Sequence, residues 1–198
     1  MTTSLLDVDW PVHTDRLVIR PVHGADEEAI WSYRRLEESS MWLTSAPGDR
    51  TAFHEWFRNP DEQQHMLVIE LGGAVIGNLM VRVEDAWAQV EVRERAARTQ
   101  AELGWVLHPD HSGHGYATEA VREILAICFG RLGLRRVVAG CFADNVASWR
   151  LMERLGMRRE QHTVRDALHR SGQWMDGYGY ALLADEWRAS VEQPPPSV

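Results

Sequence analysis

The stretch from Ser112 to Ala120 contains the clearest chemical signal of the sequence. It reads Ser-Gly-His-Gly-Tyr-Ala-Thr-Glu-Ala and lies between a strand-like apolar run and a long amphipathic run. Such a loop directs several backbone N–H groups and the positive end of a helix at one point, where a phosphate group can bind. Glycine suits this loop because a Cβ would hold the backbone away from the anion. A plain tight turn between a strand and a helix would give the same pattern, so the glycines alone leave both interpretations open.

Short apolar runs predict the strands that surround this loop. One run leads into the loop through Pro109, and Gly72-Gly73 joins two others as the tight turn of a β-hairpin. The predicted strands are 17–21, 66–71, 74–81, 100–107, 136–142, 157–163 and 174–183. The connection 84–98 is highly charged, and we expect a long exposed link that is partly helical.

Helical spacing of apolar residues predicts four helices between these strands. They are 26–36, capped by Asp26; a helix that contains Phe53, Trp56 and Phe57 and ends near Asn59-Pro60; 117–132, stopped by Gly133; and a short helix that Asp144 or Asn145 caps and Gly156 closes. Because helices interleave with mainly hairpin-connected strands, the predicted fold class is α/β or α+β.

The composition is that of one globular domain without a membrane span. The chain has 198 residues, 44% of them hydrophobic, and no apolar run approaches the roughly 20 residues of a transmembrane helix. Its 29 acidic and 21 basic side chains give a net charge of -8, which argues against general nucleic-acid binding. This charge fits either a cationic substrate or simple solubility. No signal peptide is evident and the two cysteines suggest no disulfide framework, so we expect a cytoplasmic protein.

Five short motifs follow one another along the chain. They are Thr14-x-Arg16-Leu17-x-x-Arg20; Gly113-x-Gly115-Tyr116-Ala117-Thr118-Glu119-Ala120; Asp144-Asn145-x-Ala147-Ser148; Leu155-Gly156-Met157; and Glu186-Trp187. With them the chain resembles the GCN5-related N-acetyltransferase (GNAT) superfamily, and it is most similar to the Rim-type branch, which acetylates ribosomal-protein N-termini. The resemblance implies a GNAT fold, a mixed and mostly antiparallel sheet flanked by helices, with two splayed parallel strands at the cofactor site. It implies one domain over 1–190, and we expect the proline-rich 191–198 to be a disordered tail.

The resemblance also implies acetyl-CoA as co-substrate, lying between strands 100–107 and 136–142. Its pantetheine arm would pair with the backbone of Trp105, Val106 and Leu107 like an added strand, and the Val106 N–H would stabilise the oxyanion. Asn145 would hydrogen-bond the pantetheine amide, which is compatible with capping a helix. The pyrophosphate would bind the glycine loop at Ser112, Gly113, His114, Gly115, Tyr116, Ala117 and Thr118.

Two positions depart from the family pattern. Ser112 stands where the loop usually begins with Gln or Arg, so a long donor to the pyrophosphate is lost while the backbone cradle remains. Met152 stands where many members carry a tyrosine as general acid, four residues before the glycine that closes the short helix. The chain therefore cannot use that tyrosine.

Acyl transfer to an amine needs a base for the ammonium proton, an oxyanion site and often a proton for the leaving thiolate. Glu102, on the strand that would carry the acetyl group, is the first candidate base and Glu160 the second; each could instead be an outward-facing surface carboxylate. Ser148 would lie near the same helix face as Asn145 and could protonate or hydrogen-bond the CoA sulfur, or make only a local hydrogen bond. Cys141 is interpreted as a small buried hydrophobe rather than a nucleophile.

Three histidines and one tryptophan attract attention near these residues. His108, His111 and His114 flank the loop, but Pro109 prevents one helix from presenting them together and no further ligand completes a set, so we expect no metal. The imidazoles would instead border the CoA phosphates. Trp42, in a less regular segment, could line the acceptor-amine site.

The predicted function is acetyl-CoA-dependent acetylation of a primary amine by direct attack in a ternary complex. The acceptor could be a protein N-terminus or a small amine such as a polyamine, an amino acid or an aminoglycoside. The alternative is a non-catalytic acyl-CoA-binding sensor or interaction module. A Rossmann enzyme is excluded because the loop lacks G-x-G-x-x-G spacing and occurs late in the chain. We expect no nucleic-acid or membrane partner, and the 84–98 connection or the C-terminal segment could form a homodimer interface.

Overall fold

A computed structural model describes residues 5–46 and 48–192. These residues fall into two compact units. Among the described residues, the N-terminal unit comprises Leu5–Arg82 and Leu103–Ile124, and the C-terminal unit comprises Val83–Glu102 and Leu125–Glu192. Each unit has its own strands and helices, and the candidate functional residues are divided between the two.

The N-terminal unit is built on antiparallel strands in the order β1-β2-β3-β4. They are β1 (Val12–His13), β2 (Val18–Pro21), β3 (Met66–Leu71) and β4 (Ala74–Glu84), whose last two residues belong to the C-terminal unit. Gly72 and Gly73 make the turn between β3 and β4 with φ of +58° and +86°, which glycine adopts without strain. The predicted hairpin is confirmed, and β4 runs three residues past its predicted end.

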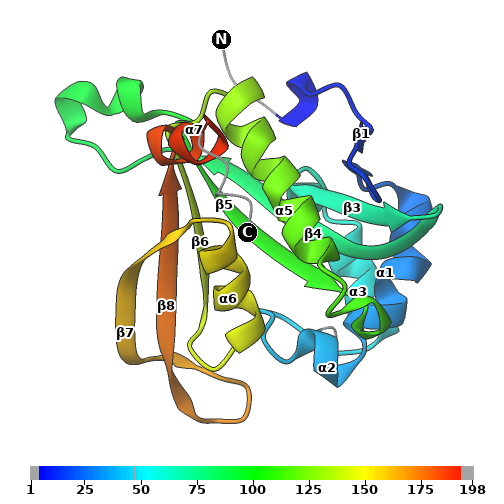
Figure 1. Cartoon of the computed structure of the whole chain (residues 1–198). Helices are drawn as coiled ribbons and strands as arrows, with labels where there is room; N and C mark the ends of the chain where they lie inside the picture. Colours follow the sequence, from blue (N-terminus) through cyan, green and yellow to red (C-terminus); the bar gives the residue numbers. More distant parts are fainter. Residues whose placement is uncertain (1–4, 47, 193–198) are drawn as a thin grey trace, which may run out of the picture. The chain divides into compact units, whose positions relative to one another are not determined.

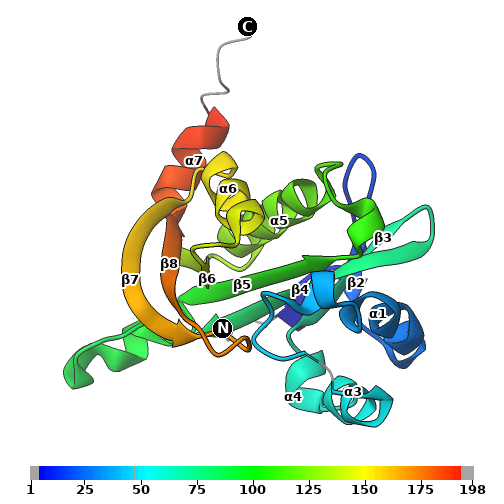
Figure 2. The ribbon, with the colours of Figure 1, turned by 90° about the horizontal axis from the view of Figure 1, so that it is seen from below.

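Helices cover both faces of these strands, with α1 and α3 on one face and α5 on the other (Figure 2). The elements are α1 (Glu27–Arg34), α2 (Glu37–Ser40), α3 (Arg50–Phe57), α4 (Pro60–Gln63), the 3-10 turns η1 (Leu5–Asp7), η2 (Gly24–Asp26) and η4 (Pro109–His111), and α5 (Tyr116–Ala126), whose last two residues belong to the C-terminal unit. Helices α1 and α3 agree with the predicted ones, whereas the short α2 and α4 were not predicted. A buried hydrophobic cluster joins α1 and α3 to the strands and consists of Ile30, Tyr33, Phe53, Phe57, Met66, Val68 and Val106.

The C-terminal unit contains one parallel strand pair and a long antiparallel hairpin (Figure 1). Strand β6 (Arg136–Phe142) pairs along its whole length with β8 (Trp174–Leu183), and β8 pairs with β7 (Arg158–Leu168). The start of β5 (Gln100–Leu107) pairs in parallel with the start of β6, and Glu102 lies opposite Val138. The bounds of β5, β6 and β8 agree with the prediction, and β7 extends five residues further than expected.

The helices of the C-terminal unit include one that the sequence pattern did not predict. They are α6 (Val146–Arg154), α7 (Ala184–Glu192), the 3-10 segment η3 (Val90–Ala96) and the π-helical turn η5 (Ile127–Arg131). Helix α7 follows β8 directly (Figure 2), and its start is fixed because the Glu186 carboxylate accepts the Leu183 N–H at 2.9 Å. Val191 and Glu192, expected in the tail, therefore belong to a helix. The rest of the expected tail, 193–198, lies outside the described residues.

Two helix ends differ from expectation. The predicted helix 117–132 is α5 followed by the wider turn η5, in which Leu132 N–H donates to the Ile127 carbonyl at 2.9 Å, and Gly133 ends it with φ of +63°. Asp26 precedes α1 as predicted, but its carboxylate does not cap the helix. It instead accepts the His23 N–H at 2.9 Å and two bonds from the Arg20 guanidinium at 2.8 Å each.

The fold class is mixed α/β (α+β), as predicted. The strand pairs are antiparallel except for β5 with β6, and helices flank the strands in each unit. Among the helices of residues 5–46 and 48–192, none is long and apolar enough to cross a membrane.

Candidate active site

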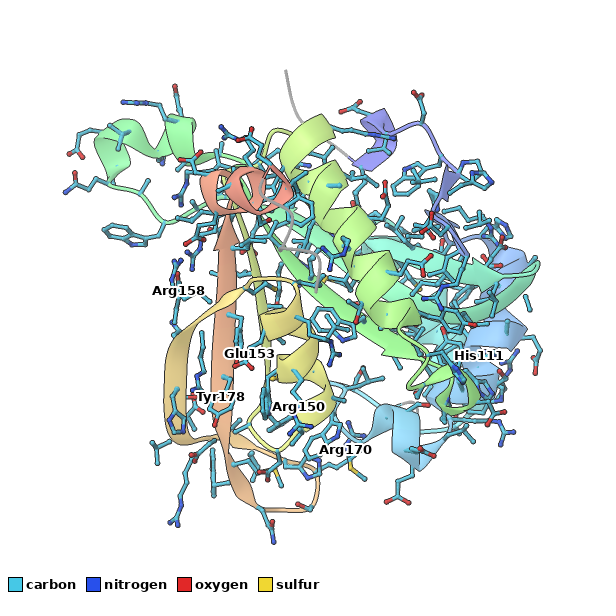
Figure 3. All side chains as sticks on the ribbon, in the orientation of Figure 1. His111, Arg150, Glu153, Arg158, Arg170 and Tyr178 are labelled. Carbon is cyan, nitrogen blue, oxygen red and sulfur yellow. The ribbon has the colours of Figure 1, made fainter. Side chains whose placement is uncertain are left out.

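Strand β5 leads into the predicted phosphate-binding loop of the N-terminal unit. A short turn at Pro109–His111 follows the strand (His111 is labelled in Figure 3), and the next four residues are exposed. Gly113 and Gly115 have φ of +80° and +81°, where a side chain would be strained. Helix α5 starts at Tyr116, so the N–H groups of its first turn have no intrahelical acceptor and lie at the positive end of the helix dipole. The loop can therefore hold an anion through backbone donors.

Arg16 and Glu119 hold this loop from outside. The Arg16 guanidinium donates to the His114 carbonyl at 3.1 Å and lies over the Tyr116 ring, 4.6 Å from its centroid. Glu119, in the first turn of α5, accepts from Arg16 Nε at 2.7 Å, from the Arg16 N–H at 3.0 Å and from Thr14 Oγ1 at 2.5 Å. These contacts join the motif that begins at Thr14 to the motif that begins at Gly113, through residues more than 100 positions apart. The two motifs therefore form one hydrogen-bonded cluster in the folded chain.

The charge state of Glu119 favours these contacts with Arg16 and Thr14. Partial burial raises the pKa of its carboxyl, but hydrogen bonds from Thr14 and Arg16 outweigh burial and hold the pKa below its ordinary value. Glu119 is therefore ionised at neutral pH, and its ion pair with Arg16 (2.6 Å) persists. Arg16 places a cation beside the loop, whereas the sequence motif indicated only the loss of a long donor at Ser112.

We expect Arg16→Ala to weaken CoA binding about tenfold, because a charge-assisted hydrogen bond to the loop contributes roughly 1.5–3 kcal/mol. The KM for acetyl-CoA should rise while kcat changes little, since the loop is predicted to hold the pyrophosphate rather than the acetyl group. Calorimetric titration with CoA measures the first effect. Arg188→Ala is the matched control, because among the described residues Arg188 pairs with Asp185 alone (2.9 Å), on an exposed surface. Equal CoA affinities of the two variants would show that Arg16 does not support the loop for CoA binding.

The strand segment predicted to bind the pantetheine arm is anchored on β4. Trp105 and Leu107 are half-buried, and the Val106 side chain is buried in the cluster of α1, α3 and β3. The His108 N–H donates to the Ile76 carbonyl at 2.8 Å, and Gly77 leaves room for the Val106 carbonyl and the Leu107 side chain. The role of the Val106 N–H as oxyanion donor stays a prediction.

Asn145 and Ser148 lie together at the start of α6, in the C-terminal unit. The Asn145 side-chain oxygen accepts the Ser148 N–H at 3.2 Å, so Asn145 caps the helix. Its amide nitrogen and the Ser148 hydroxyl make no hydrogen bond with any described residue, and both residues are half-buried. The cap therefore leaves both polar groups available to a ligand, and their proposed roles toward CoA stay predictions.

The two candidate bases have different surroundings. Glu102 is half-buried on β5. Glu160 accepts from Arg136 at 2.5 and 3.2 Å and from Arg158 at 2.6 Å. Hydrogen bonds from Arg136 and then Arg158 outweigh burial and lower the pKa of Glu160. Because a base must accept a proton, this environment opposes the role predicted for Glu160, and the role of Glu102 as the base stays a prediction.

Three further side chains of the C-terminal unit, Met152, Cys141 and Tyr180, fit structural roles. Met152 is fully buried in α6, and burial raises the pKa of the half-buried Cys141 thiol to about 11, which disfavours a thiolate nucleophile. The Tyr180 hydroxyl donates to Glu153 at 3.0 Å (Glu153 is labelled in Figure 3). Burial and this bond raise the Tyr180 pKa to about 12.

The loop histidines contact aromatic rings. His111 lies edge-on to His108 with ring centroids 5.9 Å apart, and His114 lies 5.7 Å from Tyr116. Within residues 5–46 and 48–192, no group of three or more His, Cys, Asp or Glu side chains is arranged to hold a metal ion. Trp42 is half-buried after α2, and its role at the acceptor site stays a prediction.

Comparison with known proteins identifies the family. The acetyltransferase (GNAT) domain matches residues 16–158. The uncharacterized N-acetyltransferase p20 of Bacillus licheniformis is 33% identical over 184 residues, which cover 89% of this chain and 97% of that protein. The uncharacterized N-acetyltransferase YnaD of Bacillus subtilis is 26% identical over 179 residues, covering 89% and 98%. The chain belongs to the GNAT family and is an acetyltransferase.

Solved structures agree with this assignment. A GNAT-family acetyltransferase from Bacillus anthracis superimposes with a TM-score of 0.75 at 25% identity, covering 89% of this chain and 99% of the other. The spermidine N-acetyltransferase of Vibrio cholerae, solved with CoA and spermine, superimposes with a TM-score of 0.71 at 16% identity, covering 88% and 99%. These likenesses confirm the GNAT fold.

Proposed function

We propose that this acetyltransferase moves an acetyl group from acetyl-CoA to a primary amine, either a protein N-terminus or a small amine, in a ternary complex. The observation that carries the proposal is the exposed glycine loop at the start of α5, held by Arg16 and Glu119. Acetyl-CoA supplies an activated thioester. The loop residues 112–118 would bind its pyrophosphate through backbone N–H groups. A cytoplasmic setting and membership of the Rim-type branch remain parts of this proposal.

Glu102, the Val106 N–H and Ser148 would each act on a different part of the reaction. Glu102 would take one proton from the ammonium group of the acceptor, directly or through water, so that the nitrogen lone pair can form the new N–C bond. The Val106 N–H would stabilise negative charge on the carbonyl oxygen. As the C–S bond breaks, Ser148 would hydrogen-bond the departing sulfur, and the proton released by the amine balances the thiolate.

The experiment that tests this proposal measures CoA binding and turnover separately. Calorimetry should detect CoA binding to the wild-type chain, and Gly115→Val should weaken it at least about tenfold because a branched side chain cannot adopt its φ of +81° without strain. Gly130→Ala is the control, since Gly130 has neither a positive φ nor an atom within 4 Å of an added Cβ. Absence of CoA binding to the wild-type chain would contradict the proposal.

Turnover is then followed as free thiol released from acetyl-CoA across N-terminal peptides and small amines. We expect Glu102→Gln to lower kcat roughly 100-fold near neutral pH, as loss of a general base does, with CoA affinity retained. Ser148→Ala should cost less, because a hydroxyl that only hydrogen-bonds the sulfur contributes about one hydrogen bond. CoA binding without turnover on any amine would favour the non-catalytic alternative.

A further inference from the structure

A small pocket lies between α1, α3 and the segment before α3, in the N-terminal unit. Its volume is about 200 Å³, and its described lining consists of Arg34, Ser45, Gly48, Phe53, Trp56 and two alanines. This is below the roughly 300 Å³ of pockets that hold whole drug-sized ligands, so it fits one functional group with a short stem. Phe53 also belongs to the buried cluster that contains Val106, which connects the pocket to the strand proposed to carry the acetyl group.

Arg34 gives this pocket a cation with no described carboxylate within ion-pair distance, and Glu62 acts on it only through a longer-range attraction. Its guanidinium lies over the Trp56 ring, 4.3 Å from the centroid. Its only hydrogen bond with the described residues is a long one, 3.5 Å from Nε to Asn78 Oδ1, and that oxygen already accepts the Tyr33 hydroxyl at 2.9 Å. Burial lowers the pKa of Arg34, yet arginine stays protonated at neutral pH. A partly buried cation of this kind is normally satisfied by an anion.

Two other arginines of the same unit, Arg20 and Arg50, are paired with carboxylates. Arg20 lies within 2.8 Å of Asp26 and 2.6 Å of Glu70. Arg50 also lies against the Phe53 ring, 5.6 Å from its centroid, but it pairs with Glu28 at 2.8 Å. Arg34 forms no such ion pair with any described carboxylate. Aromatic walls and a planar guanidinium with free donors suit a planar anion that can accept two parallel hydrogen bonds.

We propose that this pocket binds the carboxylate of the acceptor, so that the preferred substrates are amines that also carry a carboxylate. The inference rests on the proposed function and names its substrate class. Arg34 would hold the carboxylate bidentately, with the Ser45 hydroxyl as a further donor and Trp56 stacked beneath the guanidinium. A fixed carboxylate would orient the acceptor chain, which is how an arginine in a pocket confers substrate selectivity.

The experiment compares an amino carboxylic acid with its carboxamide, which has nearly the same shape and lacks the charge. Thiol release should give a kcat/KM at least about tenfold higher for the acid, because one charge-assisted bidentate pair is lost with the amide. Arg34→Gln should abolish this preference, and Arg34→Lys should retain part of it because charge persists without the planar fork. Arg50→Gln, which changes a ring-stacked arginine outside the pocket, should keep it.

Binding measured by calorimetry on the CoA-saturated protein separates failure of this proposal from failure of the proposed function. Tighter binding of the acid than of the amide, lost in Arg34→Gln but kept in Arg50→Gln, supports the pocket even if no tested amine is acetylated. Turnover with equal kcat/KM for acid and amide overturns it while leaving acetyl transfer intact. Equal binding of the two ligands also overturns it. Thermal unfolding confirms that each variant is folded.

Discussion

Replacing Gly77 with alanine is expected to lower the free energy of unfolding by about 3 kcal/mol and to weaken CoA binding at least about tenfold. A Cβ at this position would lie 2.5 Å from the Val106 carbonyl oxygen and 2.5 Å from Leu107 Cδ2. The leucine side chain can rotate away, but the carbonyl belongs to the backbone, so β5 must move away from β4. The atoms that move are those proposed to pair with the pantetheine arm, so affinity should fall together with stability.

Urea unfolding and calorimetric titration with CoA measure these two effects. Gly104→Ala is the matched control on β5, because its Cβ would lie 3.5 Å from the Met80 side chain, an ordinary van der Waals contact. We expect that variant to stay within about 1 kcal/mol of the wild-type stability. If Gly77→Ala matched the control in both measurements, the close approach of β4 and β5 would not be what positions the strand.

Elements with strong local signals could be predicted from the sequence. The β3–β4 hairpin followed from two adjacent glycines between apolar runs, and β5 and β6 matched their predicted bounds because both are apolar runs that begin and end sharply. Strand β7 was predicted five residues too short, since its last turn-side residues are mostly exposed and show no apolar alternation. Helix α7 was missed because its signal is a single capping glutamate rather than a run.

Some features of the candidate site could likewise be predicted from the sequence, and others could not. The glycine loop was readable because its φ values require glycine, and the Asn145 cap because its side chain bonds a nearby N–H. The partners of charged residues were not readable, since Arg16 meets Glu119 only through the fold. Glu160 shows the consequence: its sequence position suggested a base, whereas its ion pairs with Arg136 and Arg158 set its chemistry. Arg34 carries no sequence signal because its pocket forms only in the folded chain.

The largest loss of stability is expected from Arg20→Met, about 3–5 kcal/mol at pH 7, because removal of one partner leaves a buried charge uncompensated. The Arg20 guanidinium makes two 2.8 Å hydrogen bonds with Asp26 and reaches Glu70 at 2.6 Å. Asp26 is only 4% exposed, so in the variant its carboxylate would retain just the His23 contacts. Arg188→Met, at an exposed pair, should change stability by less than about 1 kcal/mol.

The same variant should show an inverted dependence of stability on pH. In the wild-type chain burial raises the Asp26 pKa, but hydrogen bonds from Arg20 and His23 outweigh it, so the folded pKa lies below the unfolded value of about 3.9. Asp26 therefore stabilises the wild type above that pH, and this contribution is lost as the pH falls through the folded pKa. Without Arg20, burial dominates and the pKa of Asp26 in the folded variant rises above its unfolded value. Protonation of Asp26 therefore stabilises the folded variant.

The difference in unfolding free energy between wild type and Arg20→Met should consequently be largest near neutral pH and shrink as the pH falls below about 4. Urea unfolding at a series of pH values measures it. Arg20→Met combined with Asp26→Asn should recover part of the lost stability at pH 7, because the uncompensated charge is gone, and its difference from wild type should vary less with pH. A constant difference between wild type and Arg20→Met from pH 7 to pH 3 would show that packing of the arginine stem, rather than the charge of Asp26, accounts for the loss.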